Sequence, residues 1–183
     1  PVREECASYL TGDGALTLHT DPPGAEVELL RYEVTNRRLV PVPVRSLGTT
    51  PLNAVVLPRG SYLCLLRHPD RAEVRYPVHI GRQYHSPGDS VPPGVRVPHA
   101  VRLPLPEELG PEDCYVPAGW FTSGGDPEAI GDVLPGRELW CESFAMQRFP
   151  VTNREYIAFL DALVADGRTE EALLFQPRER GGT

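Results

Sequence analysis

The sequence contains no lysine, because all 18 basic residues of the 183 are arginine. This absence excludes Schiff-base catalysis, and it removes both the phosphate-binding lysine of Walker-type sites and the strand lysine of protein kinases. The formal net charge of -7 also argues against a nucleic-acid-binding module, which usually presents a basic face. We therefore expect neither phosphoryl transfer by this chain nor a nucleic-acid partner.

Paired cysteines and long apolar runs are also lacking. The four cysteines, Cys6, Cys64, Cys114 and Cys141, form no CxxC pair, so the chain has neither a zinc-ribbon nor a thioredoxin-type motif. Their low density favours reduced thiols over a disulfide scaffold, which predicts a cytoplasmic location. No stretch approaches the roughly 18 apolar residues of a membrane span, so we expect no membrane partner. The first residue is Pro1 rather than Met, which favours a piece of a longer protein.

What the chain has in abundance is proline and glycine, with 21 and 17 residues respectively. These numbers are too high for a helical bundle and predict short strands joined by turns. Alternating apolar residues place the expected strands at 15–20, 25–32, 39–44, 54–57, 61–67, 73–80 and 100–105. Pro41 and Pro43 cannot donate to a ladder, so 39–44 is expected to be an edge or irregular strand. The fold class is therefore mainly β, beginning with a small β-sandwich.

Three turn motifs in this first part carry a family resemblance. Pro22-Pro23-Gly24-Ala25, Gly48-Thr49-Thr50-Pro51-Leu52 and Leu57-Pro58-Arg59-Gly60-Ser61-Tyr62 follow in order along the chain. Together they resemble a PEGA domain, with Pro23 in the place of the family's glutamate. The resemblance implies a small β-sandwich attached to a larger bacterial protein, without a general catalytic role.

A second resemblance begins at Tyr115. The stretches Tyr115–Phe121 and Gly124-Gly125-Asp126, followed by Phe144–Tyr156, resemble the opening of the formylglycine-generating enzyme, or sulfatase-modifying factor, family. That resemblance implies an α+β scaffold similar to C-type lectins, of which this chain would hold only the first part. The family's copper-binding cysteine pair lies later in its domain, and neither Cys114 nor Cys141 has a matching context.

Helical periodicity supports a helix within the second resemblance. Thr152 and Glu155 form a Thr-x-x-Glu capping box, which predicts that the helix begins at Asn153. Gly167 is placed where a left-handed helix end is expected. The residues of the apolar stripe in between are Tyr156, Phe159, Leu160, Leu163 and Val164. We interpret this stripe as a core face that needs a partner surface.

The expected organisation has four parts. Residues 1–13 form the tail of an upstream region, 14–106 the PEGA-like sandwich, 107–114 an acidic, proline-flanked linker, and 115–183 a truncated formylglycine-generating enzyme-like portion. A Pro- and Gly-rich loop is expected over 86–98. This order of domains is similar to the C-terminal half of certain bacterial serine/threonine kinases, although the chain itself carries no kinase signature.

No residue is assigned a catalytic, cofactor-binding or metal-binding role, and no cofactor is expected. Gly12-Asp13-Gly14 is half of a dinucleotide fingerprint without its third glycine or helix, and is interpreted as a turn. The chain has no GxSxG elbow. Two further groups lack the spacing of a metal site and are interpreted as strand, surface or linker residues: His68, His79, His85 and His99, and Glu107, Glu108, Glu112 and Asp113.

Two functional hypotheses follow from the sequence. The preferred one is a non-catalytic regulatory or binding module, not itself an enzyme, from a kinase-like parent protein. Its partners would be the remainder of the parent chain and a protein or small ligand. The alternative is the front part of a formylglycine-generating oxidase, whose parent would convert a sulfatase cysteine to formylglycine with copper and oxygen. A late cysteine pair downstream of Thr183 would favour the oxidase.

Overall fold

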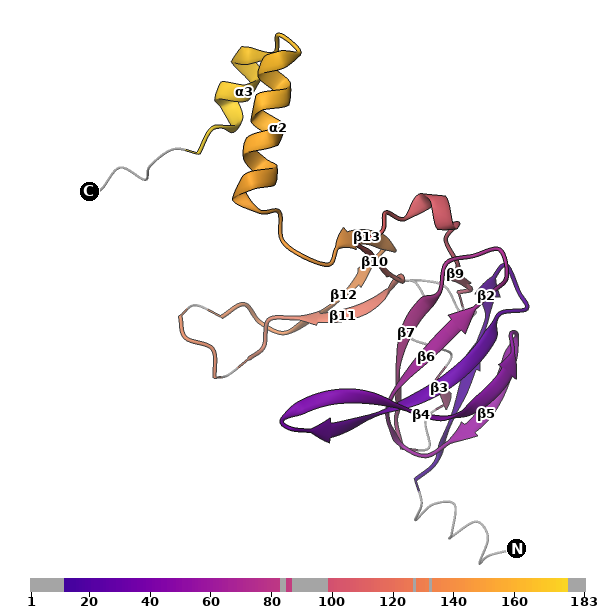
Figure 1. Cartoon of the computed structure of the whole chain (residues 1–183). Helices are drawn as coiled ribbons and strands as arrows, with labels where there is room; N and C mark the ends of the chain where they lie inside the picture. Colours follow the sequence, from indigo (N-terminus) through magenta and orange to yellow (C-terminus); the bar gives the residue numbers. More distant parts are fainter. Residues whose placement is uncertain (1–11, 83–84, 87–98, 127, 132, 178–183) are drawn as a thin grey trace, which may run out of the picture. The chain divides into compact units, whose positions relative to one another are not determined.

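The computed structural model describes residues 12–82, 85–86, 99–126, 128–131 and 133–177 (Figure 1). The fold is mainly β, as the composition predicts, with antiparallel sheets followed by two helices. The chain divides into two compact units, Pro1–Met146 and Gln147–Thr183, which we describe separately.

A four-stranded antiparallel sheet forms the largest layer of the first unit. Its strands are β3 (Glu26–Thr35), β4 (Arg38–Thr49), β6 (Gly60–Arg67) and β7 (Val74–Ile80), in the order β4-β3-β6-β7. The β3–β4 hairpin turns at two residues of positive φ, Asn36 at 51° and Arg37 at 62°, which is typical of a two-residue hairpin loop. β4 lies at the edge of the sheet, which confirms the position predicted from its prolines.

Two smaller sheets complete this part of the first unit. β5 (Leu52–Leu57), β1 (Gly14–Leu18) and the short β8 (His85–Ser86) form one of them, in that order. β2 (Thr20–Asp21) pairs in parallel with β9 (Val101–Arg102) to form the other.

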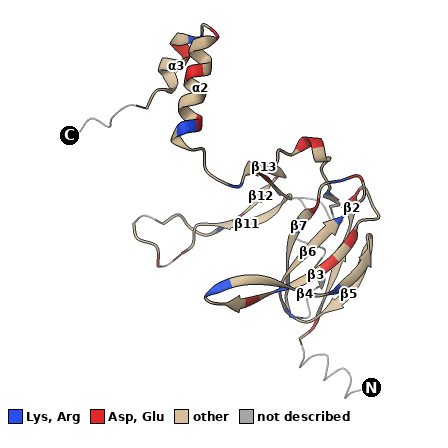
Figure 2. Cartoon of the chain, viewed as in Figure 1, with Lys and Arg blue, Asp and Glu red and all other residues tan. Residues whose placement is uncertain are grey.

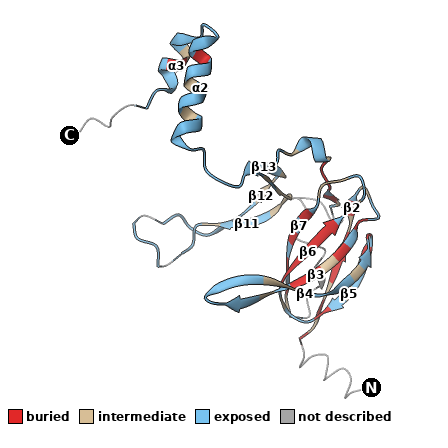
Figure 3. Ribbon diagram, viewed as in Figure 1, coloured by how far each residue is buried: buried red, intermediate tan, exposed pale blue. Residues whose placement is uncertain are grey.

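Alternation along the strands builds the main core of this unit. Leu16 and Leu18, two positions apart in the strand expected over 15–20, are 0% and 1% exposed. β3, β6 and β7 contribute the inward residues Val27, Leu29, Tyr62, Cys64, Leu66, Val74, Tyr76, Val78 and Ile80 to the same cluster (Figure 3). Leu30, Leu63 and Leu65 form a second, smaller cluster with Tyr32. The large sheet therefore buries apolar side chains on both faces.

One predicted turn differs in the structure, and one predicted loop lies almost wholly outside the described residues. The segment 47–52 was expected to be a turn, but β4 continues through Thr49 and only Thr50 and Pro51 connect it to β5. β4 gains this length by accommodating irregularities in its pairing with β3, between Val27 and Glu28 and between Leu29 and Leu30. Of the loop expected over 86–98, residues 87–98 lie outside the described residues.

The segment expected as a linker contains ordered local structure. It carries the short 3-10 helix η1 (Pro106–Glu108), and β10 (Asp113–Val116) already begins at its end. β10 pairs with β13 (Phe144–Gln147), and β11 (Gly119–Ser123) pairs with β12 (Arg137–Cys141). Tyr115 of β10 packs against the main core. Strands β10 to β12, which the sequence places after the linker, thus belong to the first compact unit.

The loop after β11 requires glycine. Gly124 and Gly125 both have φ of 77°, and a Cβ on Gly124 would lie 2.4 Å from the backbone oxygen of Leu134. A larger residue would therefore force the two sides of this loop apart.

The second unit contains α2 (Asn153–Ala165) and α3 (Thr169–Phe175). The predicted capping box is present, because the Glu155 N–H donates to the Thr152 hydroxyl and the Thr152 N–H donates to the Glu155 carboxylate. Gly167 has φ of 77°, as expected after a helix end. Over the described part of this unit, only Leu163 and Ala172 are buried. No described helix is long and apolar enough to cross a bilayer.

Candidate functional site

The described side chains do not assemble a metal-binding cluster or a catalytic triad. No group of three or more His, Cys, Asp and Glu side chains among them could hold a metal ion. The Ser61 hydroxyl lies 3.4 Å from Nδ1 of His79, but the pair is exposed and no described carboxylate bonds the other ring nitrogen. A serine nucleophile needs a base that is itself oriented by a third group. This pair therefore lacks the geometry of a hydrolase.

The histidines and glycines weighed from the sequence lie apart from one another. Gly12 has φ of 69° and leads directly into β1, so no helix follows this turn. His68 directly follows β6, where its Nδ1 accepts a bond from the Asp70 N–H, whereas His79 lies within β7. His99 contacts the Trp140 ring edge-on, at a centroid distance of 6.4 Å. The structure does not bring these side chains into one site.

The acidic residues of the expected linker have local partners. The Glu108 carboxylate accepts the Leu105 N–H at 2.7 Å and pairs with the Arg102 guanidinium at 2.5 Å, and these two bonds hold the pKa of Glu108 below its usual value. The Asp113 carboxylate accepts the Gly110 N–H at 2.9 Å. These carboxylates stabilise turns, and they do not converge on a common cation position.

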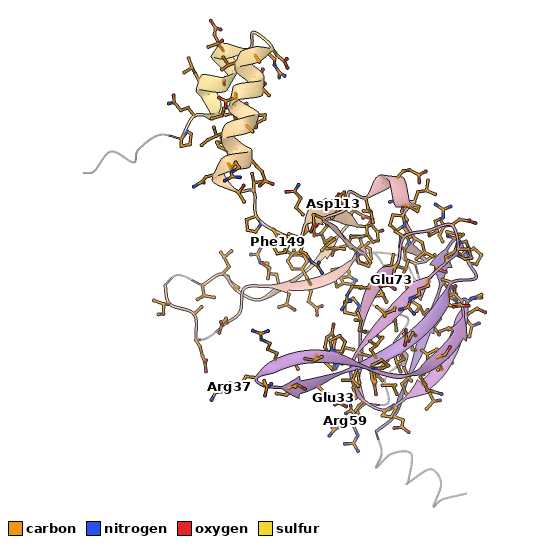
Figure 4. The ribbon with its side chains drawn as sticks, in the orientation of Figure 1. Glu33, Arg37, Arg59, Glu73, Asp113 and Phe149 are labelled. Atoms are coloured by element: carbon orange, nitrogen blue, oxygen red, sulfur yellow. The ribbon has the colours of Figure 1, made fainter. Side chains whose placement is uncertain are left out.

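Charged side chains on the large sheet form a surface network. The Arg67 guanidinium lies 2.7 Å from carboxylate oxygens of both Glu28 and Glu73, and both bonds raise the pKa of Arg67. Each of the three side chains is about a third or more exposed, so the network contributes little to stability. Figure 2 shows Asp and Glu positions interspersed with Arg along these strands, and Figure 4 marks Glu73 at the start of β7.

An apolar pocket of about 550 Å³ is the strongest candidate for a binding site. Its size falls in the range of natural ligand sites. It is built from β7, from the β10–β11 connection and from the ends of β12 and β13. The lining residues are Arg75, Tyr76, Pro77, Tyr115, Val116, Pro117, Ala118, Gly119, Trp120, Phe121, Cys141 and Phe144. All of them belong to the first compact unit.

We call this site the aromatic pocket. Strand pairing holds its aromatic side chains in place. Trp120 on β11 and Trp140 on β12 are direct cross-strand partners, and their rings meet edge-to-face at 5.7 Å and 75°. Nε1 of Trp140 donates to a carboxylate oxygen of Glu142 at 2.7 Å. Edge-to-face pairs of this kind are favourable beyond their buried area. The pairing fixes Trp120 at the pocket, where the residue remains 40% exposed.

The charge of the aromatic pocket is of one sign. Arg75 is its single charged residue among the described lining residues, and it forms no ion pair with any described carboxylate. The Cys141 thiol also reaches the lining and lies 3.4 Å from the Glu142 carbonyl oxygen. Cys64 lies elsewhere in the core, where burial raises the pKa of its thiol to about 12 and makes it unreactive. The pocket therefore offers apolar surface and one free guanidinium.

Sequence reasoning did not find this pocket. Its residues come from stretches assigned to two different parts of the chain, 75–77 and 115–144, and no local motif links them. One signal in the sequence could have indicated it: aromatic residues are concentrated at Trp120, Phe121, Trp140 and Phe144. The structure leaves all four at least partly exposed.

Comparison of the chain with protein-family models, with curated proteins and with solved structures finds no match. The two family resemblances therefore rest on their sequence motifs. The structure adds one relation between motifs: the Thr50 hydroxyl accepts hydrogen bonds from the N–H groups of Gly24 and Ala25. Two of the three PEGA-like motifs are thus joined in space.

Proposed function

We propose that the chain is a non-catalytic binding module of a larger bacterial protein, and that the aromatic pocket receives an apolar segment of a protein. The observation that carries this proposal is the pocket itself, in which Trp120, Phe121 and Phe144 remain 40%, 49% and 42% exposed. Exposed aromatic side chains held rigidly by strand pairing are typical anchors of protein recognition.

The parent protein is proposed from the family resemblances. A PEGA-like sandwich followed by the opening of a sulfatase-modifying-factor-like domain fits the C-terminal region of a bacterial serine/threonine kinase, in which such a module would regulate or tether. Sequencing the gene on both sides of this segment tests the assignment. A kinase catalytic domain upstream would support it, whereas a late cysteine pair in the context of the formylglycine-generating family would favour the oxidase.

Binding by the aromatic pocket can be tested by NMR with minimal apolar probes. The chain has two tryptophans, of which Trp120 lines the pocket and Trp140 contacts the Trp120 ring, so their indole N–H signals report on the site. We expect N-acetyl-phenylalaninamide and N-acetyl-leucinamide to shift the indole signals and the Val116 amide, but not the amides of β1. Shifts confined to α2 and α3, or no shifts at all at millimolar concentrations of probe, would overturn the proposal.

A pair of variants distinguishes binding at the aromatic pocket from non-specific binding to exposed apolar surface. Phe121→Ser removes an exposed ring that lines the pocket and should weaken probe binding about tenfold, equivalent to about 1.4 kcal/mol. Val56→Ser is the control, because Val56 is 62% exposed on β5 and does not line the pocket. Equal effects of the two substitutions would contradict a specific site.

A further inference from the structure

We infer that the segment received by the aromatic pocket is a peptide that combines apolar residues with an acidic side chain, whose carboxylate pairs with Arg75. This inference rests on the proposed binding function and specifies its ligand. It combines the charge of the pocket, the exposure of its rings and the prolines in its lining.

The charge of the pocket selects for an anionic ligand. Arg75 is opposite Leu65 in the β6–β7 register, on the side of the sheet that carries the second apolar cluster. Its guanidinium lines the pocket without an ion pair to any described residue, whereas Arg67 two rungs away bonds both Glu28 and Glu73. An arginine fork beside apolar surface matches a carboxylate in geometry and charge. A ligand that supplies this carboxylate forms an ion pair with Arg75 that no described residue of the chain provides.

The exposure of the lining rings favours a peptide over an enclosed small molecule. Small-ligand sites bury most of the ligand surface, but Trp120, Phe121 and Phe144 each keep 40% or more of their surface exposed. Such a site covers one side of its ligand and leaves the other side free. A peptide, which continues in both directions beyond its anchors, fits this arrangement.

The prolines of the lining favour recognition through side chains. Pro77 offers no N–H at its position in β7, and Pro117 interrupts the chain between β10 and β11. Addition of a ligand strand needs a regular row of donors and acceptors, which these residues break. An extended peptide that places side chains between aromatic rings needs no such row. We therefore expect apolar anchors plus one acidic side chain, without formation of an additional strand.

Selection from a random peptide library tests this inference. The full chain, immobilised, is used to select phage-displayed octapeptides, and the enriched peptides are synthesised and titrated by tryptophan fluorescence. We expect enriched peptides to contain apolar residues together with Asp or Glu. Arg75→Gln should weaken their binding about tenfold, and so should replacing the acidic residue of the peptide by its amide. In the double-mutant cycle, the two changes together should cost little more than either one.

Arg59→Gln is the matched control. Arg59 is also exposed and forms no ion pair with the described residues, but it lies in the β5–β6 turn outside the pocket (Figure 4). It should leave binding unchanged. Enriched peptides without acidic residues, or equal binding to the Arg75→Gln variant, would overturn the ligand assignment while leaving pocket binding intact. Enrichment that is insensitive to Phe121→Ser, or no enrichment, would overturn both proposals.

Discussion

The hydroxyl oxygens of Thr20 and Thr50 lie 2.5 Å apart, and both side chains are buried. Thr20 donates its single proton to the Pro22 carbonyl at 2.8 Å, so Thr50 is the donor between the two hydroxyls. The Thr50 oxygen in turn accepts the N–H groups of Gly24 and Ala25 at 3.1 and 3.0 Å. A continuous chain of hydrogen bonds therefore joins two turns that are far apart in sequence, and each bond polarises the next.

Removal of the Thr50 hydroxyl should destabilise the first unit. Thr50→Val keeps the shape of the side chain but leaves the Ala25 N–H and the Thr20 oxygen without this partner in a buried site. We expect a loss of about 2 kcal/mol in the free energy of unfolding, measured by urea denaturation. Thr50→Ser should retain most of the stability, and Thr49→Val, at the exposed neighbour, should change it by less than about 0.5 kcal/mol. Equal stability of Thr50→Val and Thr49→Val would contradict the role of this hydroxyl.

The Tyr62 hydroxyl secures the turn between β5 and β6. It donates to the Pro58 carbonyl at 2.9 Å, and the side chain is 3% exposed. Tyr62→Phe keeps the buried ring and removes only this bond, so the free energy of unfolding should fall by about 1 kcal/mol. Tyr32→Phe is the control, because Tyr32 is half-buried and its hydroxyl has no hydrogen bond with the described residues. A larger loss for Tyr32→Phe than for Tyr62→Phe would contradict this account.

Local chemistry made much of this structure predictable. Alternation predicted the strand that contains Leu16 and Leu18, the prolines predicted an edge position for β4, and the Thr152–Glu155 capping box predicted the start of α2. In each case the deciding interaction is between residues close in sequence, or is a backbone property of one residue. These are the features that periodicity and turn chemistry describe.

Features that depend on contacts between residues far apart in the sequence were not predicted. Gly48 and Thr49 have the composition of a turn, yet they continue β4 because they pair with Val27 and Glu26 of β3. The aromatic pocket is formed where β7 meets a segment about forty residues later, which no local pattern specifies. The family assignments stay predictions, because their motifs are short and local and no family model matches the chain.

Acid should weaken the start of α2. The Thr152 N–H and hydroxyl both donate to the Glu155 carboxylate at 2.7 Å and hold the pKa of Glu155 below its usual value. Because the folded pKa is lowered, this contribution is complete above the unfolded pKa of about 4.3 and is lost as pH falls through the folded value. We expect the Thr152 amide signal to follow this titration by NMR. Glu155→Gln keeps the capping geometry and should make that signal independent of pH across the window. A Thr152 signal that titrates equally in both proteins would refute the assignment.

The two compact units should differ in local stability. β6 contains five consecutive buried residues, Tyr62 to Leu66, whereas α2 buries only Leu163. The aromatic contacts of Phe159 with Tyr156 and Phe175, at 6.0 and 5.8 Å, leave all three rings partly exposed. Since few buried contacts oppose opening, we expect α2 amides to exchange with solvent about 100-fold faster than β6 amides after correction for intrinsic rates, or about 2.8 kcal/mol. Equal protection of both elements would mean that α2 is stabilised by more than these contacts. It would contradict the interpretation that the apolar stripe of α2 needs a partner surface.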